Sequence, residues 1–207
     1  MDELLQALEK LNSELQRDDM VLNANVIGGF SLYLQNLTIE IRQSHDIDSV
    51  TKLTEEVKEK VRKIGQDMGI DLRWLNDDAL SLYDEFRFAG IDLEQLKFSP
   101  NTRIDFSNIH LNVVDISDFA RLKLFSLFLE VFDFMQYNKA FERGQDLQDI
   151  KAIAMASDID IMAILNETTR YVADSRYRGL TQALLESYLT ETLSNTQIND
   201  FLKANRN

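Results

Sequence analysis

Hydrophobic residues recur at helical spacing in two stretches of the first half of the chain. The first set predicts an amphipathic helix and comprises Leu4, Leu8, Leu11 and Leu15. The second set predicts a helix that ends near Gly65 or Gly69, and it comprises Val50, Leu53, Val57, Val61 and Ile64. Short apolar runs around these helices predict strands over residues 20–27, 39–48 and 70–75 and a short helix over 30–37.

The stretch before residue 117 ends in β-branched residues. The runs 103–106 and 109–116 predict a hairpin that turns around Ser107 and Asn108. Residues 78–99 fit no single pattern.

From Ser117 onward the spacing is helical. The first of these helices is apolar nearly all round, which predicts that it is buried centrally. Later helices are predicted over 147–156, 162–173, 181–193 and 197–204. We therefore expect an α+β protein, with a mixed-sheet lobe over residues 1–116 followed by a C-terminal helical lobe over 117–207.

Composition narrows the class of protein. The chain has 207 residues, 44% of them hydrophobic, which is enough for a folded core. It has no cysteine, which excludes disulfides, thiolate metal sites and a thiol nucleophile. The most apolar stretch, residues 119–135, carries several charges and is too short to span a bilayer. The N-terminus is acidic and unlike a signal peptide, so the sequence predicts a soluble cytoplasmic protein with no membrane partner.

Two features of the charge distribution bear on function. The formal net charge of -13 argues against a general nucleic-acid binder, because phosphate backbones are held by excess lysine and arginine. A local basic cluster, which we interpret as a solvated helix face, comprises Arg170, Arg176 and Arg178 beside Tyr171 and Tyr177. Lys123 lies on the otherwise apolar helix, so it must reach solvent, pair with an acid or meet a phosphate.

A glycine pair followed by two aspartates is the best candidate for a functional site. Gly28 and Gly29 follow the first predicted strand and allow the backbone to turn and approach a ligand closely. Ser31, in the first turn of the next helix, could donate a hydroxyl hydrogen bond to phosphate. Asp46 and Asp48 project from the same face of a strand, where two carboxylates can bind Mg²⁺ together with substrate phosphates.

These residues resemble a known family, the minimal nucleotidyltransferase fold, and more closely the AbiEii-like nucleotidyltransferases of bacteria. That family has a GG turn, an R-x-T-x-D-I-D strand, a W-L-N segment, a late lysine and an R-x-x-D-x-x-D helix. The matching residues, within about residues 20–155, are Gly28-Gly29; Arg42, Ser44 in place of the threonine, Asp46 and Asp48; Trp74, Leu75 and Asn76; Lys123; and Arg143, Asp146 and Asp149.

The resemblance implies a Mg²⁺-dependent enzyme that transfers a nucleoside monophosphate from an NTP to an acceptor, which is RNA for some members. It implies metal binding by Asp46 and Asp48, and nucleotide binding by Gly28, Gly29, Ser31, Arg42 and Lys123. Asp146 would act as base or orienting carboxylate, with Asp149 as the alternative. Several members are toxins paired with a cognate antitoxin protein, so toxin or defence activity is expected.

One expected feature of such folds has no unique match in the sequence. The third carboxylate is normally on a later strand, and Asp71, Asp77 and Asp105 are all candidates, with Asp71 on the third predicted strand. This open question supports an alternative: a catalytically silent fold that acts as an antitoxin or regulatory partner. The acidic charge would suit a basic protein partner.

Overall fold

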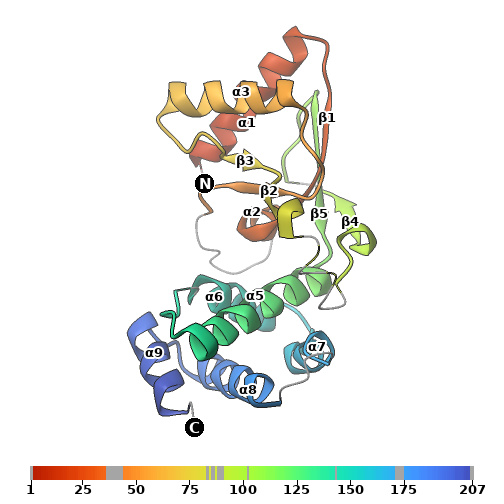
Figure 1. The fold of residues 1–207 in the computed structure, drawn as a ribbon. Helices are drawn as coiled ribbons and strands as arrows, with labels where there is room; N and C mark the ends of the chain where they lie inside the picture. The colour runs from red at the N-terminus through yellow and green to blue at the C-terminus, as the bar shows by residue number, and fades with distance from the viewer. Residues whose placement is uncertain are drawn as a thin grey trace. The chain divides into compact units, whose positions relative to one another are not determined.

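The computed structural model describes residues 2–35, 44–82, 84, 87, 91–101, 103–142, 144–170 and 175–205 (Figure 1). The chain forms two compact units. The first contains residues 1–84 and 93–115, and the second contains residues 85–92 and 116–207. The described strands all lie in the first unit, and helices α5–α9 lie in the second, so the protein is α+β.

The first unit combines a five-stranded sheet with three α-helices and two short 3-10 helices among its described residues. In chain order its elements are α1 (Asp2–Arg17), β1 (Leu22–Ile27), α2 (Gly28–Leu34), β2 (Ile47–Ser49), α3 (Glu55–Met68), β3 (Leu75–Asn76), η1 (Asp78–Leu82), η2 (Leu93–Gln95), β4 (Phe98–Pro100) and β5 (Ile109–Val114).

The sheet is mixed, with strand order β3-β2-β1-β5-β4. β1 is antiparallel to β2 and parallel to β5, while β2 is parallel to β3 and β4 is antiparallel to β5. The two edges are therefore β3, with two residues, and β4, which contains Pro100. Pro100 is the only proline of the chain.

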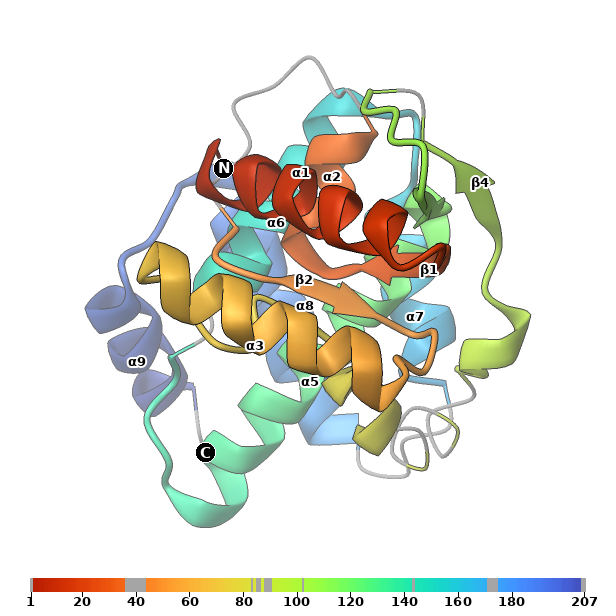
Figure 2. The same ribbon diagram turned by 90° about the horizontal axis from the view of Figure 1, so that it is seen from above.

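One face of the sheet packs against α1 and α3, which lie next to each other (Figures 1 and 2). Leu22, Ala24 and Val26 of β1 are buried in this core, whereas the alternate residues Asn23 and Asn25 are not. This alternation follows from the two-residue period of a strand. The opposite face of the sheet carries Asn23 and Asn25 together with the apolar residues Ile27 and Val114.

Helix α3 confirms the predicted end near Gly69, but it begins at Glu55, so Val50 and Leu53 of the predicted set precede it. The Thr54 side chain accepts a hydrogen bond from the Val57 N–H and caps the first turn. Gly69 ends the helix in the left-handed conformation, with φ 69°. The predicted helix around Leu4–Leu15 is likewise confirmed as α1, and the first predicted strand as β1.

Two predicted strands are shorter than expected. The described part of the second predicted strand is extended only over Ile47–Ser49, because Ser44 donates its hydroxyl hydrogen bond to the Asp46 carbonyl and forms a local turn. The third is limited to Leu75–Asn76. Asp71, which we placed on that strand, instead accepts the Arg73 N–H in a turn before it.

The predicted hairpin of residues 103–106 with 109–116 is wrong. The antiparallel partner of β5 is β4, which begins at the end of the 78–99 stretch that fits no single pattern. The Asn101 side chain accepts the Ile104 N–H and donates to the Leu111 carbonyl, and these bonds hold the segment after β4 in a loop. A three-residue strand containing proline carries almost no sequence signal, and it is tolerated because β4 is an edge.

The second unit is helical, as predicted. Its helices are α5 (Ile116–Tyr137), α6 (Gly144–Ala156), α7 (Ile161–Thr168), α8 (Ser175–Thr190) and α9 (Asn195–Ala204). α5 contacts α6, α7 and α8, which explains why it is apolar nearly all round. In the part of the chain that the structure describes, no helix combines the length and apolarity required to cross a membrane.

Candidate functional site

The glycine pair forms a tight connection between β1 and α2. Gly28 has φ +72°, a left-handed conformation that favours glycine. A Cβ atom at Gly28 would lie 2.2 Å from Asp48 Oδ2 and 3.1 Å from Asp48 Cγ. Glycine is therefore required twice here, for its backbone conformation and because the Asp48 carboxylate occupies the space of a side chain.

Asp48 connects three segments of the predicted motif. Its neighbours across the sheet are Ile27 on β1 and Asn76 on β3. Asn76 Nδ2 donates a hydrogen bond to Asp48 Oδ1 at 3.3 Å. The glycine turn, the aspartate strand and the W-L-N segment thus meet at one carboxylate, which is half-buried.

The other predicted residues of the turn have local roles. Ser31 is buried, and its hydroxyl donates a hydrogen bond to the Gly28 carbonyl at 2.8 Å, which stabilises the turn. Gly29 is also buried. Asp46 is exposed and lies one residue before β2. Arg42 lies outside the described residues.

None of the three candidates for a third carboxylate occupies a strand position that faces Asp48. Asp71 is exposed in the turn before β3, and Asp105 is exposed in the loop before β5. Asp77 follows β3 and binds Leu53 and Lys58. Among the described residues, no group of three or more acidic or histidine side chains could hold a metal ion. Asn76, an amide, is the β3 residue that faces Asp48.

The residue types are those of a magnesium ion that is shared with a ligand. Carboxylate and amide oxygens are hard ligands, and Mg²⁺ is commonly held by one or two carboxylates while substrate phosphates and water complete its shell. Asp46 and Asp48 would be the two carboxylates of such a site, and their role as metal ligands stays a prediction. The sequence singled out Asn76 as part of the W-L-N segment but did not predict its direct contact with Asp48.

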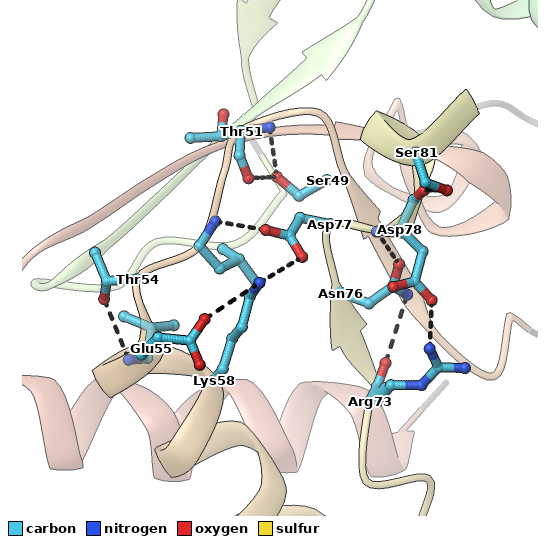
Figure 3. A network of polar contacts seen from close by, with 12 residues as sticks. Ser49, Thr51, Thr54, Glu55, Lys58, Arg73, Asn76, Asp77, Asp78 and Ser81 are labelled. Atoms are coloured by element: carbon cyan, nitrogen blue, oxygen red, sulfur yellow. Dashed lines mark hydrogen bonds and ion pairs between the residues drawn. The ribbon is translucent and has the colours of Figure 1, made fainter. Parts of the chain in front are cut away.

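A polar network fixes the end of β3 and thereby the position of Asn76 (Figure 3). Asp77 Oδ2 accepts the Leu53 N–H at 3.0 Å, and Asp77 Oδ1 lies 3.0 Å from Lys58 Nζ. Asn76 Oδ1 accepts the Asp78 N–H at 3.0 Å. Burial raises the pKa of Asp77, but the Leu53 N–H and the Lys58 ammonium outweigh it and hold the pKa below its usual range.

Asp77→Asn is expected to lower the free energy of unfolding by about 1–2 kcal/mol at neutral pH, because it removes a charged partner from both bonds. The lowered pKa means that Asp77 stabilises the fold above its unfolded value of about 3.9, and that this contribution is lost as pH falls through the folded value. Urea unfolding at about pH 7 and about pH 3 measures both effects.

The matched control for this prediction is Asp78→Asn. Asp78 pairs with Arg73 at 2.7 Å, but their side chains are 54% and 70% exposed, so the change should cost under about 1 kcal/mol. An equal loss for the two variants, or a loss for Asp77→Asn that persists at low pH, would contradict the role given to Asp77.

In the second unit, Lys123 on α5 pairs with two acids of α6. Lys123 Nζ lies 2.6 Å from Asp146 Oδ1 and 2.9 Å from Asp149 Oδ2. The two acids are three residues apart and so share one face of their helix. The Lys123 side chain is 12% exposed and each carboxylate 2%. Of the three environments that the sequence allowed for Lys123, the structure has the pairing with acids.

The pairing keeps Lys123 charged. Burial lowers the pKa of Lys123, but the charges of Asp146 and Asp149 and their hydrogen bonds outweigh burial and raise the pKa above its ordinary value. Arg143, the first residue of the predicted R-x-x-D-x-x-D helix, lies outside the described residues. Roles of Lys123, Asp146 and Asp149 in catalysis stay predictions.

Comparisons of the chain with models of protein families, with curated proteins and with solved structures found no match. The functional argument therefore depends on the residues and contacts described above.

Proposed function

We propose that this protein is a Mg²⁺-dependent nucleotidyltransferase that transfers a nucleoside monophosphate from an NTP to an acceptor, for which RNA is one candidate. The convergence of Gly28, Asp48 and Asn76 carries the proposal. These residues come from three separate motifs of the family that the sequence resembles. A coincidental sequence match would not require their side chains and backbone to meet.

In the proposed reaction, a hydroxyl oxygen of the acceptor attacks the α-phosphorus of the NTP. A new P–O bond forms while the bond from the α-phosphorus to the bridging oxygen breaks, and pyrophosphate leaves. The hydroxyl proton passes through a carboxylate to water. Gly28 and Gly29 would let the phosphates approach the backbone closely. Magnesium held by Asp46 and Asp48 would neutralise phosphate charge.

The resemblance gives further roles to the helical unit. Lys123 would neutralise triphosphate charge, and Asp146 would be the base or orienting carboxylate, with Asp149 as the alternative. In the structure Lys123 is paired with Asp146 and Asp149, so the first role would require a nucleotide phosphate to compete with these carboxylates for the ammonium. A toxin or defence role with a cognate antitoxin protein, in the cytoplasm where NTPs are abundant, is part of the same proposal.

The test is transfer of label from each of the four NTPs to total RNA with Mg²⁺. The double variant Asp46→Asn, Asp48→Asn is expected to lower transfer by at least about 100-fold, the scale on which loss of a principal charge-stabilising group acts. Its melting temperature should be close to that of the original protein, since Asp46 is exposed and Asp48 half-buried.

The matched control removes two exposed acids elsewhere in the same unit, with Glu9→Gln and Asp67→Asn. It makes the same change in net charge and should retain transfer. Failure of the original protein to label any acceptor with any NTP would refute catalysis.

A second candidate function is a nucleotidyltransferase-like binding module that acts as antitoxin or regulatory partner without catalysis. It is favoured by one observation: the described residue of β3 that faces Asp48 is the amide Asn76. Nucleotide-dependent stabilisation separates the two functions. A ligand at 100 times its Kd adds about 2.7 kcal/mol to the free energy of unfolding. An NTP with Mg²⁺ that leaves the melting temperature unchanged would favour the binding module.

A further inference from the structure

The face of the sheet opposite α1 and α3 carries polar side chains from its two central strands. Asn23 of β1 lies beside His110 of β5, and Asn25 lies beside Asn112. Asn23 and His110 are exposed, whereas Asn25 and Asn112 are half-buried. None of the four has a charged side-chain partner in the described structure, so this part of the face is polar, with Asp48 of β2 on the same side.

Asn25 and Asn112 form an amide pair. Asn112 Nδ2 donates a hydrogen bond to Asn25 Oδ1 at 3.0 Å. Within the described residues, this bond leaves Asn25 Nδ2 as an unused donor and Asn112 Oδ1 as an unused acceptor. If the nitrogen and oxygen atoms of both side-chain amides are exchanged, the pair still leaves one hydrogen-bond donor beside one acceptor.

The backbone under the pair is firmly held. The Asn25 N–H donates to Thr51 Oγ1 at 2.9 Å, and the Asn25 carbonyl accepts the Val50 N–H at 2.9 Å and the Ser49 hydroxyl at 3.3 Å. An amide pair on such a backbone presents its free donor and acceptor in a fixed direction. This preorganisation lowers the entropic cost of binding a ligand.

The strand register relates the amide pair to the candidate site. Asp48 faces Ile27, two residues after Asn25, and alternation puts Asp48 and Asn25 on the same side of the sheet. Two residues of strand correspond to about 7 Å. Gly28 follows Ile27 directly. Along the direction of β1, Asp48 therefore lies between the amide pair and the glycine turn.

We propose that the Asn25–Asn112 pair binds the acceptor, and that the acceptor group has a donor and an acceptor atom side by side. The inference rests on the proposed function. In nucleotidyl transfer the attacking and leaving oxygens lie in line on opposite sides of phosphorus. With the leaving pyrophosphate at the glycine turn, the acceptor comes from the side of the amide pair.

The ligand chemistry follows from the pair. The terminal ribose 2′,3′-diol of an RNA and the hydrogen-bonding edge of its terminal base both offer an adjacent donor and acceptor. Both are uncharged, and they suit a chain of net charge -13 better than a phosphate backbone does. The acceptor is thus held by its end.

The experiment measures transfer from a labelled NTP to a short RNA with the variants Asn25→Leu, Asn112→Leu and both together. Loss of two hydrogen bonds is expected to raise the KM for RNA about 10-fold or more in the double variant. Stabilisation of the protein by NTP with Mg²⁺ should not change. Asn23→Leu is the matched control. It makes the same substitution two residues earlier on the same face of β1 and should change the KM for RNA less than about 2-fold.

Two RNA ends identify the group that is bound. A terminal 2′-deoxyribose removes one hydroxyl of the diol and should reproduce the KM increase if the pair binds ribose. A terminal abasic ribose should reproduce it if the pair binds the base edge. Asn25→Ser and Asn112→Ser replace the leucine variants if those fail to fold.

An unchanged KM for RNA in the double variant, with NTP stabilisation and transfer intact, overturns the inference and leaves the proposed function standing. Loss of NTP stabilisation in the double variant also overturns it, since the pair would then serve the nucleotide or the fold. An original protein that neither binds NTP nor transfers label overturns both. Capture of a protein by this face, without RNA binding, would likewise reject the acceptor role.

Discussion

Lys123→Met is expected to lower the free energy of unfolding of the helical unit by about 3–5 kcal/mol, the scale found when one partner of a buried ion pair is removed. The substitution preserves the length of the side chain and deletes its charge. It leaves Asp146 and Asp149, both 2% exposed, without the ammonium that lies 2.6 and 2.9 Å from their oxygens. Urea unfolding followed by circular dichroism measures the loss.

Two comparisons make this result specific. Lys139→Met removes a lysine that pairs with Asp133 at 3.3 Å, but the side chains are 58% and 37% exposed, so the cost should be under about 1 kcal/mol. Adding Asp146→Leu and Asp149→Leu to Lys123→Met should recover much of the stability, since an apolar replacement of a buried charge group removes its desolvation cost. Equal losses of unfolding free energy for Lys123→Met and Lys139→Met would contradict the burial of Lys123 with Asp146 and Asp149.

Gly28→Ala is expected to reduce nucleotidyl transfer by about 100-fold or more, the scale on which a displacement of about 1 Å affects catalysis. The new Cβ would lie 2.2 Å from Asp48 Oδ2, and the least costly relief is to move that carboxylate. The left-handed backbone adds about 1–2 kcal/mol of destabilisation. Transfer assays and thermal melts of the same preparation measure the two effects.

Gly69→Ala is the control for the destabilisation that a left-handed backbone causes in a residue other than glycine. Gly69 has φ +69°, nearly that of Gly28, but a Cβ there would meet nothing within 4 Å. It should lose about the same 1–2 kcal/mol and keep its transfer activity and its stabilisation by NTP. If both alanine variants retain full activity, Asp48 has no part in the reaction.

Helices were predictable from this sequence because their signals are long. α1 and α3 each repeat their apolar spacing over several turns. The end of α3 is marked by Gly69, because the left-handed conformation at that position favours glycine. α5 was recognisable as a buried helix from its apolar surface alone. Its pairing with α6 through Lys123 was one of three environments that the sequence allowed, because spacing within a helix does not determine which helix it faces.

Short strands and loops were predicted less well because side-chain hydrogen bonds decide them. Asp71 and Asn101 each bind a backbone N–H and form turns where β-branched or apolar neighbours suggested strands. For the candidate site, the glycine turn and Asp48 were predictable as a motif. The role of Asn76 was not, since the pairing of β2 with β3 is a contact between distant residues that no local pattern encodes.

The composition of the sheet edges bears on how this protein behaves at high concentration. An exposed strand that offers a row of free amide and carbonyl groups can recruit further chains into fibrils. β3 is only two residues long, and Pro100 deprives β4 of an amide hydrogen. Concentrated solutions should therefore resist amyloid-like assembly, and replacing Pro100 with valine would restore a donor at an edge that is otherwise blunted.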